Sequence, residues 1–283
     1  MRLFLLTSLT MLAFASNSVL NRAALSAGAI DALPFGTLRL VAGAVVLGAL
    51  CLALRGGPRL AGPGRMAAVA GLLAYIYGFS AAYQALDAGL GALILFGMVQ
   101  VSMFAGSLAG GERPPPQRWA GACLALIGLG WLFWPGDAAR ISLAHGALMA
   151  MAGIGWGVYS LAGRLASDPL AATAANFLLA ATGGLLLSAA WPAPPVPVPS
   201  SVTGITLALV SGAVTSGLGY ALWYRVLPDL PGTVAAVAQL TVPVLAMLGG
   251  VIVLGEPLTA AFAVAAGLVL GGVALSLVPA RRL

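Results

Sequence analysis

Apolar residues run along this chain in long stretches that short polar or proline-rich breaks separate. The hydrocarbon core of a membrane is about 30 Å thick, and an α-helix crosses it in about 20 residues. The stretches have this length, so the pattern predicts transmembrane helices and an all-α integral membrane protein. We expect ten such helices, at residues 3–25, 34–54, 66–86, 90–109, 118–134, 144–165, 171–191, 202–227, 232–254 and 259–278.

The breaks contain residues that end helices. Pro34 opens the second stretch, and Pro114 to Pro116 separate the fourth from the fifth. Proline lacks a backbone N–H and disfavours helical angles in the residue before it. The proline-rich segment 192–199 predicts a stiff connector outside the membrane. Inside the ninth stretch, Pro243 predicts a kink and is a candidate hinge.

Two apolar stretches joined by a Gly-Glu turn occur twice, at Gly111-Glu112 and at Gly255-Glu256. Shorter matches accompany them, pairing Ser18 and Arg22 with Ser160 and Arg164, and Tyr83 with Tyr224. We therefore expect two five-helix repeats, at residues 1–137 and 138–283. Five is odd, so the second repeat must cross the membrane in the opposite sense. Inverted repeats are typical of secondary transporters, which bind substrate near the midplane between the halves.

The first stretch also allows another interpretation. A positively charged start, an apolar run and Ala13-Phe14-Ala15 resemble a secretory signal with its cleavage site. However, the apolar character continues through Leu25, and the repeat needs a partner for the sixth stretch. A transmembrane helix is the better interpretation.

Composition agrees with a membrane protein. Hydrophobic residues make up 61% of the chain and charged residues 7%, whereas globular domains have about 25% charged residues. The net charge of +6 comes from scattered arginines. A nucleic-acid-binding protein would cluster them on one face, so we expect no nucleic-acid partner.

The arginines also predict orientation, because they are enriched in cytoplasmic loops. Arg22 and Arg140 lie on one side of the expected membrane, and Arg39 lies inside the second stretch. The side that holds both termini has ten: Arg2, Arg55, Arg59, Arg65, Arg113, Arg118, Arg164, Arg225, Arg281 and Arg282. We expect a multi-pass protein of the cell inner membrane with both termini in the cytoplasm.

Few residues suit catalysis, a metal or a cofactor, and we expect none of the three. Cys51 and Cys123 lie inside apolar stretches, where small core residues are a better interpretation than a disulfide or metal pair. His145 is the single histidine of the sequence, so no histidine pair exists. An intramembrane enzyme would need a nucleophile with a base, or paired carboxylates within a stretch. The sequence offers neither pattern.

The acidic residues all fall at stretch ends or in loops: Asp31, Asp87, Glu112, Asp137, Asp168, Asp229 and Glu256. A carboxylate inside the membrane would mark a proton or cation pathway. Without one, we expect facilitated diffusion or exchange without strong proton coupling. Glu112 and Glu256 are expected to hold their turns against a helix end and not to contact substrate.

Aromatic side chains gather on three stretches. Tyr75, Phe79 and Tyr83 share one helix face by their spacing, Trp156 lies on the sixth stretch and Tyr220 on the eighth. An interfacial belt fits Tyr83, near a stretch end. Phe79 and Trp156 lie near mid-stretch, which favours a cavity lining.

Amides and an arginine complete the candidate substrate site. Asn17, Gln100 and Gln239 lie within stretches, where they either join helices by hydrogen bonds or contact substrate. Arg39 lies about 7–8 Å inside the second stretch. It either snorkels to the outer interface or anchors an anionic substrate group. Such a pocket suits an uncharged or zwitterionic solute with an apolar body.

Two halves of five stretches, each with a Gly-Glu turn near its end, resemble the EamA family of the drug/metabolite transporter superfamily. The clearer match runs from Pro243 to Gly267. In the first copy Val99 replaces the proline, and the prolines 114–116 replace Leu258-Thr259. The resemblance implies export of small metabolites such as amino acids, and an aromatic amino acid exporter is among the characterised members. It also implies a central cavity near stretches three, four, eight and nine, with one and six beside it.

We therefore expect an exporter of small neutral or zwitterionic metabolites, foremost amino acids including aromatic ones, that works by alternating access. A proton-coupled efflux carrier for drugs or other metabolites is the alternative, and an accessory membrane subunit is another. The expected partners are a small-molecule substrate and the lipid bilayer, and the oligomeric state stays open.

Overall fold

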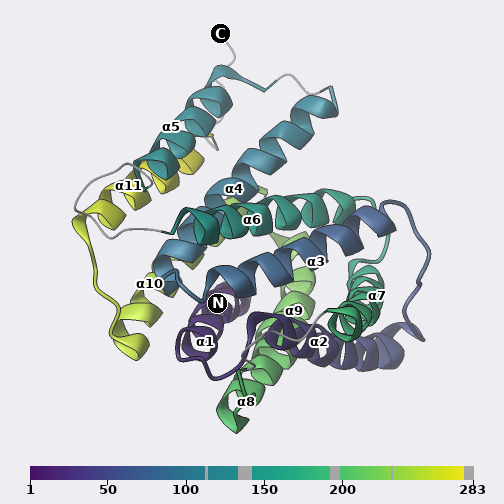
Figure 1. The fold of residues 1–283 in the computed structure, drawn as a ribbon. Coiled ribbons are helices and arrows are strands. Elements are labelled where there is room, and N and C mark those ends of the chain that lie inside the picture. The colour runs from purple at the N-terminus through teal and green to yellow at the C-terminus, as the bar shows by residue number, and fades with distance from the viewer. Residues whose placement is uncertain (112–113, 133–141, 192–197, 231, 277–283) are drawn as a thin grey trace.

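The computed structural model describes residues 1–111, 114–132, 142–191, 198–230 and 232–276. These ranges fold into helices and loops (Figure 1). In chain order the helices are α1 (Arg2–Ser26), α2 (Ala32–Arg55), α3 (Arg65–Ala82), α4 (Ala88–Ala109), α5 (Pro116–Leu132), α6 (Leu143–Gly163), α7 (Pro169–Ala190), α8 (Val202–Val210), η1 (Ser211–Leu218), α9 (Gly219–Val226), η2 (Leu227–Asp229), α10 (Gly232–Gly249), η3 (Gly250–Leu254) and α11 (Ala260–Ser276).

Seven helices within the described ranges are long and apolar enough to cross a membrane. One of them is the continuous run 202–229, which joins α8, η1, α9 and η2. Shorter apolar helices cover Ala238–Leu254 and Ala260–Ser276. The all-α class is confirmed and is compatible with a membrane protein. The count of ten, the five-plus-five arrangement and the side of the termini stay predictions.

Several expectations fall outside the described residues. They concern most of the proline-rich connector, the boundary between residues 137 and 138, and the residues Glu112, Arg113, Asp137, Arg140, Arg281 and Arg282.

Helix ends follow ordinary capping chemistry. The Asp168 carboxylate accepts hydrogen bonds from two N–H groups in the first turn of α7, and the Ser201 hydroxyl accepts one in α8. Such side chains satisfy N–H groups that have no partner within the helix. Gly56 and Gly255 end α2 and η3 with φ of 78° and 68°, a conformation that glycine adopts at little cost.

Helices that are far apart in the chain pack side by side: α3 with α6, α5 with α11, and α2 with α7 (Figure 1). Glycines bring two of these pairs close. Gly71 faces Gly155 between α3 and α6, and Gly121 faces Gly272 between α5 and α11, so that an added Cβ would meet the opposite carbonyl oxygen. Close backbone contact is how helices associate where lipid removes the hydrophobic drive.

The sequence motifs Gly106-x-x-x-Gly110 on α4 and Gly267-x-x-x-Gly271 on α11 predict close helix packing, and only the first of them packs against a neighbouring helix, at Gly106. Gly106 on α4 contacts Leu161 of α6. On α11, however, no described atom lies within 4 Å of a Cβ added at Gly267 or Gly271. The prediction that these two glycines pack against a neighbouring helix is therefore wrong. The spacing of small residues does not determine which helix face meets a neighbour, and Gly272 makes the contact instead.

The cysteines are free thiols in different surroundings. Cys51 is buried in the core, as expected, whereas Cys123 on α5 is exposed. The core prediction for Cys123 is therefore wrong, because its face of α5 has no other helix over it among the described residues.

Backbone hydrogen bonding changes register in two helical segments. Both η1 and η3 are π-helical, and Pro243 lies inside α10 before η3. Such π-helical segments often occur at functional sites. Here η1 packs against α1 and α2, beside the cavity described below.

Candidate functional site

A small cavity lies between α1, α3, α4, α6 and α9. Its walls are mostly aromatic and comprise Phe14, Asn17, Ser18, Tyr75, Phe79, Leu95, Phe96, Trp156 and Tyr220. Its volume is about 20 Å³, enough for roughly one water molecule. An amino acid would not fit, so this conformation holds the site nearly closed.

The aromatic rings form a connected wall around Trp156. Its ring centroid lies 4.9 Å from that of Tyr75 and 5.1 Å from that of Tyr220. Tyr75 in turn lies 5.2 Å from Phe79, and Phe14 lies 5.6 Å from Tyr220. These separations are those of favourable aromatic pairs, so four helices present one aromatic surface to the cavity.

Polar groups of α1 join it to η1 and α3. Asn17 Oδ1 accepts hydrogen bonds from the hydroxyls of Ser211 (2.8 Å) and Thr215. One turn along, Asn21 Oδ1 accepts from Ser80 Oγ at 3.1 Å. The oxygen of Asn17 thus fits the helix-joining interpretation, while the side chain also lines the cavity.

Arg39 is fully buried on α2. Its Nε donates to Ser216 Oγ (3.0 Å) and its Nη2 to the Tyr75 hydroxyl (2.9 Å). The guanidinium carbon lies 5.2 Å from the ring centroid of Tyr75 and 5.1 Å from that of Phe79, which is cation–π geometry. The snorkelling interpretation is therefore wrong, because the charged group points into protein and not to the surface.

The structure brings together five of the expected substrate-site residues around the cavity: Asn17, Tyr75, Phe79, Trp156 and Tyr220. Arg39 stands behind Tyr75 and Phe79, and Tyr83 lies one turn beyond Phe79. Gln100 and Gln239 are half-buried and do not line it. Sequence reasoning missed four lining residues and the amide next to them: Phe14, Ser18, Leu95, Phe96 and Asn21. The spacing of four between Asn17 and Asn21, and between Phe14 and Ser18, was an available signal.

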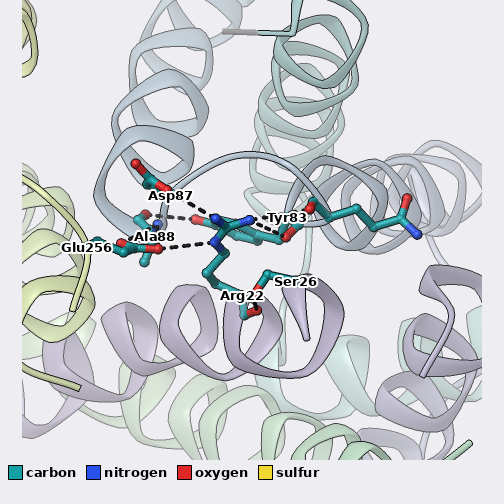
Figure 2. Close-up of polar contacts among 7 residues, drawn as sticks. Arg22, Ser26, Tyr83, Asp87, Ala88 and Glu256 are labelled. Atoms are coloured by element: carbon teal, nitrogen blue, oxygen red, sulfur yellow. Dashed lines mark hydrogen bonds and ion pairs between the residues drawn. The ribbon is translucent and has the colours of Figure 1, made fainter. Parts of the chain in front are cut away.

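A cluster of charges, here named the Arg22 cluster, comprises Arg22, Asp87 and Glu256 (Figure 2). Arg22 Nε is 3.2 Å from Glu256 Oε1, and its Nη2 is 3.2 Å from Asp87 Oδ1. Its Nη1 donates to the backbone oxygens of Tyr83 (3.4 Å) and Gln84 (3.3 Å). One guanidinium thus connects α1 with the end of α3, the start of α4 and the turn after η3.

Glu256 also holds the start of α4. The backbone N–H of Ala88, the first residue of α4, donates to Glu256 Oε2 at 2.9 Å and Oε1 at 3.0 Å (Figure 2). This confirms for Glu256 the expected contact with a helix end, which the helix dipole favours. Burial raises the pKa of the Glu256 carboxyl, while the Ala88 N–H and Arg22 oppose that rise.

The Arg22 cluster lies about one helical turn from the cavity. Ser18 and Arg22 are four residues apart on α1, as are Phe79 and Tyr83 along α3, and one turn rises about 5.4 Å. Tyr83 fills the space between: its ring lies 4.7 Å from that of Phe79, and its hydroxyl donates to the oxygen of Ala88 at 3.0 Å. The interfacial interpretation of Tyr83 is wrong, since it is fully buried. Together Tyr83 and the Arg22 cluster close this end.

Residues 145–278 match the sequence profile of the EamA-like transporter family. The chain belongs to this family. A protein of Pseudomonas aeruginosa described as uncharacterized is 48% identical over 98% of this chain and 95% of its own length. A solved structure described only as "Crystal structure of protein" matches 100% of this chain and 99% of its own at a TM-score of 0.64 and 24% identity, which shows the fold alone.

Proteins of the EamA-like family are membrane transporters. Membership therefore implies that the chain is a membrane transporter with a small-molecule substrate and lipid around it. The matched segment lies inside the expected second repeat. Because the Pseudomonas relative carries no assigned activity, the nature of the substrate has to be argued from the cavity.

Proposed function

We propose that this EamA-like transporter is an inner-membrane exporter of small neutral or zwitterionic metabolites, foremost amino acids including aromatic ones. The observation that carries the proposal is the cavity between α1, α3, α4, α6 and α9, with its aromatic wall and few polar groups. Aromatic rings accept the apolar body of such a solute, and a few polar groups orient it.

The pairing of helices supports the proposed inverted repeat. In that repeat α1 corresponds to α6, α2 to α7, α3 to the run from α8 to α9, α4 to α10 and α5 to α11. The repeat relates the contact of α3 with α6 to the contacts of α1 with α8, η1 and α9. It likewise relates the contact of α4 with α6 to the contact of α1 with α10. The pairs α2–α7, α4–α10 and α5–α11 map onto themselves and are all in contact.

Alternating access is the transport cycle that we propose, and the difference between the two ends of the molecule supports it. The Arg22 cluster closes one end, which the proposed orientation places on the outer side. Arg164, the counterpart of Arg22 in the repeat, is exposed at the end of α6. The proposed cycle opens the Arg22 end while the opposite end closes, with Pro243 in α10 as a hinge.

Transport without strong proton coupling is part of the proposal. None of the residues that line the cavity is acidic, and a carboxylate in the membrane is the usual proton carrier. A proton-coupled efflux carrier for drugs or other metabolites is the alternative, and it requires a coupling group elsewhere.

The test is uptake of radiolabelled amino acids into proteoliposomes that contain the purified protein, first without any ion gradient. We expect uptake of aromatic amino acids, lost in Trp156→Ala. The matched control is Trp119→Ala, because Trp119 is 50% exposed on α5 and does not line the cavity. Uptake only under an imposed proton gradient would favour the coupled alternative. Absence of uptake for every amino acid with and without a gradient would refute amino acid export.

A further inference from the structure

Arg39 is a buried cation without a buried anion beside it. Its relative exposure is 0%, and no carboxylate of the described residues forms an ion pair with it. Its described partners are a serine, a tyrosine hydroxyl and two rings. Burying a charge costs several kcal/mol unless it is paired, and such charges inside membranes are retained for function.

Two buried polar atoms in this region lack a hydrogen-bond partner. They are Arg39 Nη1 and the hydroxyl oxygen of Tyr220. More than nine-tenths of both side chains is buried, so water does not replace the missing partners at the surface. A buried donor without a partner is unfavourable. Both groups therefore call for an acceptor that arrives from elsewhere.

The same residues connect Arg39 to the cavity. Tyr75 accepts a hydrogen bond from Arg39 Nη2, which leaves the proton of the Tyr75 hydroxyl free to be donated onward. Tyr75, Phe79 and Tyr220 all line the cavity, and the first two lie against the guanidinium. The positive charge therefore stands directly behind the aromatic wall, with the Tyr75 hydroxyl and Ser216 Oγ as its hydrogen-bond partners.

We propose that Arg39 makes a carboxylate on the substrate a requirement for binding. When the cavity widens to admit a solute, its carboxylate accepts hydrogen bonds from Arg39 Nη1 and from the hydroxyls of Tyr75 and Tyr220. Its apolar part lies against Phe79 and Trp156. This rests on the proposed transport of small metabolites through the cavity. It restricts the neutral and zwitterionic substrates to those with a carboxylate, and it adds carboxylates that lack an amino group. Amines without a carboxylate are excluded.

The test compares four ligands that differ only in their charged groups: phenylalanine, 3-phenylpropanoate, phenylalanine amide and phenethylamine. Binding to purified protein is followed by tryptophan fluorescence and by the shift in unfolding temperature. We expect the two carboxylates to bind and the amide and amine to bind at least ten-fold more weakly. Equal binding of phenethylamine and 3-phenylpropanoate, or binding of none of the four, would overturn the inference.

Variants test Arg39 itself. Arg39→Gln should weaken both carboxylates at least ten-fold, and Arg39→Lys should restore part of the affinity, because it restores the charge. Tyr220→Phe removes only a hydroxyl and should weaken the carboxylates several-fold, so it keeps the test decisive if Arg39→Gln does not fold. Arg225→Gln is the control, since Arg225 is exposed in an ion pair with Asp229. If Arg39→Gln folds and its affinity for the carboxylates is unchanged, the proposed role of Arg39 is refuted. If Arg39→Gln does not fold, unchanged carboxylate affinity in Tyr220→Phe refutes it.

The binding assay separates this inference from the proposed function. Carboxylate-selective binding that depends on Arg39, together with a lack of transport in proteoliposomes, would refute transport and support the binding site. Transport of phenylalanine and phenethylamine alike, unaffected by Arg39→Gln, would support transport and refute the carboxylate requirement.

Discussion

The Arg22 cluster should hold one end of the cavity closed, and removal of its central charge tests this. Arg22→Gln keeps a polar, shorter side chain and removes the charge that faces Asp87 and Glu256. Both carboxylates would then lose their ion pair, and the junction of α1, α3, α4 and the turn after η3 would weaken. The closed conformation should become less populated as a result.

The size of the effect follows from the geometry of the cluster. At 3.2 Å the attraction of one pair is about 5 kcal/mol for an effective dielectric constant of about 20. Side-chain exposures of 18% for Arg22 and 9% for Glu256 mean that desolvation offsets much of this. Hydrogen bonds to charged groups contribute about 1.5–3 kcal/mol net. A loss of about 2 kcal/mol shifts the closed-to-open ratio about 30-fold.

A cysteine at Ser18 reports the opening, because Ser18 lines the cavity one turn from Arg22. Cys51 and Cys123 are first replaced by alanine. The rate of labelling by a membrane-impermeant maleimide is then measured in right-side-out and inside-out vesicles. Arg22→Gln should raise that rate about 30-fold on one side of the membrane only, the side that the cluster closes.

The exposed ion pair of Arg225 with Asp229, with side chains 71% and 59% exposed, gives a matched control. Exposed pairs contribute at most about 1 kcal/mol, so Arg225→Gln should leave the labelling rate almost unchanged. An unchanged rate in Arg22→Gln, or an equal rise in both variants, would refute the argument that the Arg22 cluster closes the cavity.

Three further predictions concern pH, packing and motion. Burial in the closed state raises the pKa of Glu256, so the closed state binds a proton more tightly than an open state in which Glu256 has an ordinary pKa. Protonation therefore favours the closed state, and labelling at the Ser18 position should slow as the pH falls through the raised pKa. Glu256→Gln should remove this pH dependence. Gly71→Ala places a Cβ 2.6 Å from the oxygen of Gly155 and should cost about 1–3 kcal/mol of stability by overpacking, seen as a lower unfolding temperature in detergent, whereas Gly267→Ala, with open space around it, should not lower it. Pro243→Ala should slow transport while ligand affinity stays within about two-fold if Pro243 is a hinge; equal rates in variant and parent would count against that role.

The sequence predicted the helices well, because the apolar stretches and the prolines between them determine where a helix can cross lipid. The stretch expected at 90–109 is α4 at 88–109, and the one at 171–191 is α7 at 169–190. The aromatic wall was predictable in part for a similar reason. Phe79 and Trp156 lie near mid-stretch, away from the interface that ordinarily attracts aromatic rings.

The rest of the fold and of the candidate site depends on which segments meet in space, and the spacing of residues along one helix does not reveal this. The contact of Glu256 with the N–H of Ala88 joins positions 168 residues apart, and the sequence gives no sign of that pairing. The burial of Arg39 depends on Tyr75 and Ser216, which lie on two other helices. The choice of Gly272 over Gly267 as a contact depends in the same way on where α5 lies.

The small volume of the closed cavity has a consequence for the cell. At about 20 Å³ the cavity holds roughly one water molecule and no continuous column of water, and a hydrophobic constriction without water does not conduct ions. Each elementary charge that leaked across would dissipate about 2.3 kcal/mol per 100 mV of membrane potential. Between transport events the tight aromatic packing therefore insulates the membrane, so an idle copy of the protein does not drain the energy that the cell stores there.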